Sequence, residues 1–399
     1  MPTREPSPYA ALWTLDPAVT YLNHGSFGAC PVPVLARQAE WRARLERQPV
    51  QFMARELEGL LDEARTALAA FVGAAPGDLA FVPNATSGVN TVLRSLVFAP
   101  GDELLTTDHA YVACENALHF VAERSGATVV VAKVPFPLDG PAAVAEAVLA
   151  RVTPRTRLAL LDHVTSPTGL VWPIAELVAA LAERGVETLV DGAHAVAMLP
   201  LDVSAIGAAY YTGNCHKWLC APKTAAFLHV RRDVQALVRP LAISHGARLR
   251  RADRSRFLLE FDWTGTVDPT AYLSVPEAIR VLGSLLPGGW PALRARNRDL
   301  ALAGRRLLCE SLGIAEPAPE SMIGSLAAVP VPDGSPAPPT SGPYRDPLQD
   351  ALLAEAGIEV PVGPWPAAPR RLLRISAAAY NTIADYERLA VALPALLRR

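Results

Sequence analysis

Short apolar runs, each closed by turn residues, recur along residues 79–230. The run Leu158–Val164 is almost continuously apolar, which is typical of a strand that is covered on both faces. Segments with helical spacing, such as 173–184, lie between the runs. Alternating strands and helices predict a mainly parallel sheet with right-handed crossovers. The expected strands are 79–83, 102–107, 128–132, 158–164, 187–190, 208–211 and 225–230.

The flanking segments predict the domain organisation. Residues 32–72, 271–286 and 291–312 have apolar positions at helical spacing, and Pro287-Gly288-Gly289 separates the last two. We therefore expect an N-terminal arm with a loop over residues 1–30, a large domain over 31–286 and a smaller domain over 287–399. The Pro-rich run Val329–Pro339 predicts a loop or an edge segment, because proline cannot continue a helix.

Composition excludes several functional classes. The 399 residues are 51% hydrophobic with a net charge of −2, so no basic field is present to attract nucleic acid or an anionic membrane. No run approaches the roughly 20 apolar residues of a membrane span, and Met1–Pro6 precedes no signal-peptide core. The five cysteines lack metal-ligand spacing, which predicts a reduced cytoplasmic compartment and no metal site.

The candidate chemistry centres on Lys217, within Tyr210–Leu219. Burial lowers the pKa of a lysine and makes it a usable nucleophile and base, although a surface lysine after a strand fits this stretch alone. Upstream, the apolar strand at 188–190 ends on Asp191, with His194 three residues later. Ligands of parallel sheets bind at such strand ends. A lysine and a carboxylate together suit pyridoxal phosphate, which needs an amine for its aldehyde and an anion at its ring nitrogen.

Other strand ends carry suitable groups. The turn after 79–83 opens a helix at Thr86 and Ser87, which predicts either an anion site at the helix N-terminus or an ordinary N-cap. Tyr111, just past another strand, can stack on an aromatic ligand, and His109 is a competing candidate. Arg374, on an expected strand at 370–376, can bind a carboxylate in bidentate fashion.

The combined motifs resemble a known family over nearly the whole chain. They are similar to the isopenicillin N epimerase-like branch of class V (fold type I) pyridoxal phosphate-dependent enzymes. This resemblance implies an α/β fold with a large domain, built on a mainly parallel seven-stranded sheet, and a smaller α+β C-terminal domain. Thr224 departs from the pattern, because a glycine is usual there. The matching stretches are Tyr21–Gly28, Asp191–His194, Gly213–Leu219, Ala221–Lys223 and Arg374–Ser376.

The resemblance also assigns roles. It implies that Lys217 holds pyridoxal phosphate, that Asp191 meets the ring nitrogen, and that Tyr111 stacks on the ring. His194 is expected at the ring or its 3-oxygen, although a satisfied core histidine is the alternative. The remaining expected cofactor ligands are Thr86, Ser87, Asn214 and His216 at the phosphate and Thr165 near the 3-oxygen.

The implied partner is a small-molecule amino-acid substrate. Arg374 is expected to bind its carboxylate, while Asn23 and His24 lie near it on a loop, unless 21–28 is a plain turn. Thr266 is expected to reach the phosphate of a neighbouring subunit, which implies a homodimer with a shared active site.

The reaction stays open at this point. We expect action at the α-carbon in small-molecule biosynthesis, such as an antibiotic pathway, by epimerisation or by C–S β-elimination from a cysteine conjugate. Decarboxylation-coupled oxidative deamination, cysteine desulfurase or aminotransferase activity, and an inactive cofactor-binding protein are the alternatives. A desulfurase needs a reactive cysteine on a mobile loop, and residues 325–365 contain none.

Overall fold

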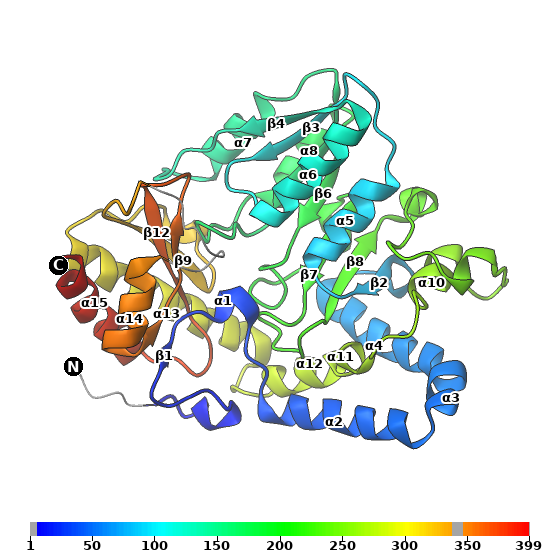
Figure 1. Cartoon of the computed structure of the whole chain (residues 1–399), viewed down its shortest axis with the longest axis horizontal. Helices are drawn as coiled ribbons and strands as arrows, with labels where there is room; N and C mark the ends of the chain where they lie inside the picture. The colour runs from blue at the N-terminus through cyan, green and yellow to red at the C-terminus, as the bar shows by residue number, and fades with distance from the viewer. Residues whose placement is uncertain (1–5, 337–345, 399) are drawn as a thin grey trace.

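A seven-stranded sheet organises most of the molecule in the computed structural model, which describes residues 6–336 and 346–398 (Figure 1). The strand order is β2-β8-β7-β6-β5-β3-β4. The strands β4, β3, β5, β6 and β7 run parallel, while β8 is antiparallel to both of its neighbours. The expected mainly parallel sheet is therefore confirmed. Its strands are β2 (Leu79–Val82), β3 (Glu103–Thr107), β4 (Thr128–Ala132), β5 (Thr156–Asp162), β6 (Glu187–Asp191), β7 (Tyr210–Asn214) and β8 (Ala226–Val230).

Helices cover both faces of this sheet, which explains the apolar runs. In β5, Leu158 and Leu160 pack into the core on one face, and Ala159 and Leu161 pack into the core on the other. The first face is covered by α5 (Ala85–Ser95), α6 (Val112–Ser125) and α10 (Arg256–Phe261). The second is covered by α4 (Leu57–Val72), α7 (Pro141–Leu149), α8 (Ile174–Ala182) and α12 (Val275–Gly283).

A second, smaller sheet lies to the left of the large one in Figure 1. Its antiparallel order is β11-β12-β9, with β9 (Leu326–Val331), β11 (Val362–Pro364) and β12 (Arg371–Ser376). Pro330 lies on the edge strand β9, where a missing N–H is tolerated. The beginning of the Pro-rich run is thus an edge segment, and its residues 337–339 lie outside the described residues. The accompanying helices are α13 (Gly289–Leu312), α14 (Pro347–Ala356) and α15 (Ile383–Leu397).

The N-terminal segment joins the two parts. Its strand β1 (Thr20–Tyr21) pairs in parallel with β10 (Ile358–Glu359), and α1 (His24–Phe27) follows. Gly28 has a φ of 71°, and a Cβ there would lie 2.1 Å from the carbonyl oxygen of His216. The loop after β1 therefore packs directly against the backbone beside Lys217. The division at residues 30 and 286 stays a prediction.

The remaining α-helices complete the chain. The expected helical region 32–72 is interrupted at Pro49, and 271–286 forms two helices. No helix among residues 6–336 and 346–398 is long and apolar enough to cross a membrane. The remaining helices are α2 (Val32–Arg47), α3 (Pro49–Gln51), α9 (Val203–Ile206) and α11 (Thr270–Leu273).

Candidate active site

Lys217 lies in a cavity at the carboxyl ends of the parallel strands. The cavity has a volume of about 240 Å³. Asp162 ends β5, Asp191 ends β6, and Lys217 follows the end of β7 by three residues. All three line the cavity together with His194 and Thr86. The expected meeting of strand-end residues around one lysine is present in the structure.

A hydrogen-bond chain defines the state of the lysine. The Trp218 Nε1–H donates to His194 Nδ1 at 3.4 Å, and His194 Nε2 lies 3.0 Å from Lys217 Nζ. An indole nitrogen can only donate, so Nδ1 accepts and a neutral imidazole carries its proton on Nε2. The Nε2–H therefore donates a hydrogen bond to Nζ, and Nζ can accept it only with the lone pair of a neutral amine. His194 thus belongs to the cavity and is not solely a core residue.

Electrostatics favour the same neutral state. Burial is the main cause that lowers the pKa of Lys217 to about 7, and Arg374 lowers it further. Asp191, Cys114 and Asp162 oppose this shift with smaller effects. Burial, and then the charge of Lys217, hold the pKa of His194 well below its usual range. Near neutral pH, a large fraction of Lys217 can act as a nucleophile and base.

Asp191 is held by two donors. Its Oδ1 accepts the Ala193 N–H at 2.9 Å, and its Oδ2 accepts the Cys114 S–H at 3.1 Å. Cys114 is buried on α6, and burial followed by the charge of Asp191 keeps its pKa well above the usual value. The thiol is therefore a proton donor that orients the carboxylate.

Asp162 is a second buried carboxyl, and the sequence analysis missed it. It is paired in register with Asp191 on the neighbouring strand. Burial, and then the charge of Asp191, raise the pKa of Asp162 well above its usual range. Burial and the neighbouring charge therefore both favour the protonated form of Asp162. Its place at the end of a buried strand, like that of Asp191, was the available signal.

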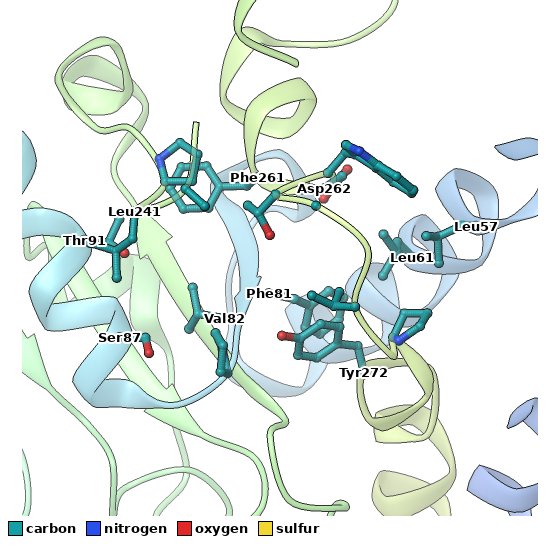
Figure 2. Close-up of a pocket in the computed structure, with 18 of the residues that line it drawn as sticks. Leu57, Leu61, Phe81, Val82, Ser87, Thr91, Leu241, Phe261, Asp262 and Tyr272 are labelled. Carbon is teal, nitrogen blue, oxygen red and sulfur yellow. The ribbon is translucent and has the colours of Figure 1, made fainter. Parts of the chain in front are cut away.

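The N-terminus of α5 closes one end of the cavity. Asn214 Oδ1 accepts the Ala85 N–H at 2.8 Å, and Asn84 caps the helix by accepting the Ser87 N–H at 2.8 Å. Thr86 and Asn214 line the cavity. Ser87 instead lines a neighbouring apolar pocket (Figure 2). The expected phosphate contact of Ser87 is therefore not supported by its position, because consecutive helical residues point to different sides.

His216 also lines the cavity. Its Nδ1 lies 3.0 Å from the Ala225 carbonyl oxygen, which must accept, so Nδ1 carries the proton. Burial, and then the charge of Lys217, lower the pKa of His216 to about 4. A neutral imidazole whose Nε2 can accept is suited to a hydrogen bond from a protonated group. Thr224 lies outside the cavity with a φ of 74°, a backbone conformation that glycine adopts more easily.

The N-terminal loop contributes different residues from those expected. Asn23 donates to Glu359 at 3.0 Å, and His24 Nδ1 lies 2.7 Å from the Tyr380 hydroxyl. Both side chains are buried and neither lines the cavity, so the expected substrate contacts of Asn23 and His24 stay a prediction. Ser26 and Phe27 line the cavity in their place.

The turns after β3 and β5 differ in whether the expected residue lines the cavity. Tyr111 lines the cavity, whereas His109 is buried with its ring nitrogens bonded to Thr168 and to a carbonyl, so the competing candidate is excluded. Thr165 is turned inward, with its hydroxyl 2.7 Å from that of Thr168. Ser166 lines the cavity instead, which corrects the expected role of Thr165.

Arg374 lies beside this cavity on β12. Its Nη1 donates to the Ser166 hydroxyl at 3.1 Å and to the Ser166 carbonyl, and its Nη2 donates to Ser26 at 3.2 Å. These contacts fix the guanidinium between the N-terminal loop and the turn after β5. A fixed guanidinium near an amine base is suited to orient a carboxylate.

Thr266 lies on an exposed loop between α10 and α11, away from the Lys217 cavity of its own chain. Its neighbours Gly265 and Val267 border the apolar pocket that contains Tyr272 and Phe261 (Figure 2). Within one chain, Thr266 therefore completes no part of the Lys217 site.

The cavity residues fit pyridoxal phosphate. They combine an amine of lowered pKa, a carboxylate at the end of the neighbouring strand, an aromatic ring and a helix N-terminus. These groups match the aldehyde, the ring nitrogen, the ring face and the phosphate of the cofactor.

Comparisons with known proteins give the family. The aminotransferase class-V sequence model matches residues 31–389. The chain is 39% identical over 397 residues to isopenicillin N epimerase of Amycolatopsis lactamdurans, covering 96% of each chain. It is 30% identical over 411 residues to L-cysteine desulfhydrase of Arabidopsis thaliana, covering 95% of this chain and 88% of the relative.

The fold has solved counterparts. A complex of the cystine C–S lyase C-DES with its product, cysteine persulfide, superposes with a TM-score of 0.76 at 23% identity. The match covers 94% of this chain and 97% of that chain. These findings confirm the predicted fold class and the resemblance to isopenicillin N epimerases.

Proposed function

Because the chain belongs to the aminotransferase class-V family, whose members use pyridoxal phosphate, we propose that it removes the α-proton of an amino-acid substrate with Lys217 as the base. That the protein is an enzyme with this cofactor, as the sequence predicted, follows from the family. The observation that carries the proposal is the contact of 3.0 Å between Lys217 Nζ and His194 Nε2, in a cavity that also contains Asp191.

The chain's own residues divide the work. When bound, pyridoxal phosphate withdraws electrons from the α-carbon of the amino acid joined to it. Asp191 supplies the negative charge for the ring nitrogen, and Cys114 and Ala193 hold that carboxylate in place. Arg374 binds the substrate carboxylate, and Lys217 takes the α-proton, for which its lowered pKa is suited.

The outcome that we favour is C–S β-elimination. The α-proton passes to Lys217, the Cβ–S bond breaks, and its electron pair leaves with sulfur as a thiolate. With one water consumed, the products are the thiol, pyruvate and ammonia. This reaction needs a single base, and Lys217 is the amine that lines the cavity in the described part of the chain. The L-cysteine desulfhydrase relative supports it.

Epimerisation is the second candidate, because the epimerase relative is 39% identical over nearly the whole chain. It needs a proton donor on the substrate face opposite Lys217. His24 is less suited to this role, because its ring nitrogens bond to Tyr380 and to the Lys217 carbonyl. Tyr111 lines the cavity and is 37% exposed, so its hydroxyl is the candidate donor.

Desulfurase and decarboxylase activities have less support. A desulfurase needs an accessible thiolate, yet Cys309 is buried on α13 and burial raises its pKa to about 11. Decarboxylation needs the carboxylate to be released, whereas Arg374 is placed to retain it.

The proposal includes a homodimer in the cytoplasm. Leu241 and Val267 border the pocket of Figure 2 and are 50% and 52% exposed, which a second copy of the chain would cover. Thr266 on the same loop would then be available to the partner's site. All five cysteines are free thiols in the structure, which supports a reducing compartment.

Product analysis tests the reaction. The holoenzyme is incubated with S-benzyl-L-cysteine in deuterated water. Release of pyruvate and a free thiol supports β-elimination, and recovery of the D-isomer with deuterium at the α-carbon supports epimerisation. If neither product forms from any of a panel of amino acids, and carbon dioxide is not released, the assignment of Lys217 as a catalytic base is wrong.

A further inference from the structure

A second cavity continues from the Lys217 cavity toward the smaller sheet. Its volume is about 410 Å³, and the two cavities share Tyr111 and Ser166 in their walls. Arg374 lies at the junction, because it lines the second cavity and binds Ser166. We call the second cavity the Trp365 cleft, after the aromatic residue in its wall.

Trp365 is held in a fixed orientation. Its Nε1–H donates to the Asp108 carbonyl at 3.2 Å, and its backbone N–H donates to the Arg370 carbonyl at 3.0 Å. Its ring meets His109 edge-on at 4.6 Å and Phe136 at 5.4 Å between centroids. An indole whose polar atom is already satisfied offers an apolar face.

Much of the remaining wall is also apolar. It contains Val362 and Leu372 from the two adjacent strands β11 and β12, and several prolines, which have no N–H to donate. The prolines are Pro167, Pro361, Pro364 and Pro366. This wall can bury a hydrocarbon surface but provides few hydrogen bonds to a polar side chain.

Charge distinguishes the two ends of the cleft. Arg374 is the basic side chain at the inner end, while Asp108 and Glu115 line the outer part. Asp108 has Lys133 at 3.7 Å, and Glu115 has His119 at 3.9 Å. A single carboxylate is therefore favoured beside Arg374, because a second, distal carboxylate would meet no other lysine or arginine among the residues that line the cleft.

We propose that the Trp365 cleft binds the substrate side chain, and that the substrate is an α-amino acid with an extended apolar side chain, such as an S-alkyl or S-aryl cysteine. The inference rests on the proposed function, which directs the α-amino group toward Lys217 and the carboxylate to Arg374. When these two groups are fixed, the Trp365 cleft is the adjoining space that the substrate side chain can occupy. Free cysteine would leave most of the apolar wall exposed to water.

Unreactive carboxylates test this without turnover. We expect the holoenzyme to bind 4-phenylbutanoate at least about tenfold more tightly than butanoate, as judged by calorimetry, because the phenyl ring is buried on Trp365. Adipate, with a distal carboxylate, should bind no better than butanoate. Equal affinities for phenylbutanoate and butanoate, or a preference for adipate, would overturn the proposal.

Variants of Trp365 test whether this residue causes the higher affinity for 4-phenylbutanoate. Trp365→Ala should lose most of the phenylbutanoate advantage and leave butanoate binding within about twofold, whereas Trp365→Phe should retain most of it. Phe120→Ala is the matched control, because Phe120 is an aromatic residue of α6 that is 40% exposed and outside the cleft. An unchanged advantage in Trp365→Ala would contradict the proposal. If that variant does not fold, the comparison of probes on the wild type still decides.

The two proposals can fail separately. If the probes bind as expected but no amino acid is turned over, the proposed function is wrong, whereas the assignment of the Trp365 cleft as a site for apolar groups stands. If S-benzyl-L-cysteine and L-cysteine have equal KM values and the probes bind equally, the proposal that the Trp365 cleft binds the substrate side chain is wrong, whereas the proposed removal of the α-proton stands.

Discussion

Replacing Lys217 by methionine should stabilise the cofactor-free protein. Burial lowers the pKa of Lys217 from 10.5 to about 7, which corresponds to about 5 kcal/mol at about 1.4 kcal/mol per pKa unit. This is the free energy by which the native state disfavours the charged amine relative to the unfolded chain. Methionine removes the charge, retains a similar length and loses the hydrogen bond with His194, worth about 1 kcal/mol. A net gain of about 2–4 kcal/mol is expected below pH 7.

The pH dependence has a definite sign. Between the folded pKa of about 7 and the unfolded value of 10.5, the unfolded chain binds more protons at Lys217 than the folded chain does. Wild-type stability therefore rises with pH across this window, and the penalty is complete below it. The advantage of Lys217→Met should accordingly be largest at neutral pH and should shrink toward pH 10.5.

Urea unfolding of the cofactor-free wild type and variant, at the two ends of this window, measures the effect. Lys223→Met is the matched control, because Lys223 is an exposed lysine of the same loop, and it should change stability by less than about 0.5 kcal/mol. A Lys217→Met variant that is no more stable than the wild type, or equally stabilised at both pH values, would refute burial as the cause of the lowered pKa.

Three further substitutions test the neighbouring groups. Asp191→Asn should retain the cofactor but lose several orders of magnitude in kcat, because the ring nitrogen loses its anion; an unchanged kcat would mean that another residue meets it. Asp162→Asn should leave the cofactor absorbance spectrum and its titration near their wild-type values at neutral pH, because burial and the charge of Asp191 favour the protonated form of Asp162; a shift of about one pH unit or more would show that it is ionised. Thr266→Ala should weaken cofactor retention on dialysis if two chains share each site, and a fully active monomer by light scattering would contradict the dimer.

Residues at strand ends were predictable from the sequence. Lys217 and Asp191 each follow a buried run, and parallel strands bring their ends to one edge of the sheet. Asp162 occupies the same position on β5, yet a carboxyl next to another carboxyl is recognisable only when the register of the strands is known. Cys114 was not predictable, because its contact with Asp191 joins a helix to a strand 77 residues away.

Turns were the least predictable part. The sequence located the turn after β5 and the N-terminal loop correctly at the cavity, but it selected Thr165 and His24, where the structure presents Ser166 and Ser26. Nearby residues of a turn, or of a short helix such as α1, point in different directions, and which one faces the cavity depends on contacts with distant parts of the chain. The bond between His24 and Tyr380, 356 residues apart, is such a contact.

Exchange of the substrate α-proton tests the central claim most directly. The holoenzyme and its Lys217→Ala variant are incubated with S-benzyl-L-cysteine and with S-methyl-L-cysteine in deuterated water, and the α-proton signal is followed by nuclear magnetic resonance. We predict that the wild type removes the α-proton, either with loss of the thiol or with deuterium incorporation. The Lys217→Ala variant should remain folded and show neither within the same time. Equal rates in the two proteins, or an unchanged α-proton signal with the wild type, would contradict the assignment of Lys217 as the base.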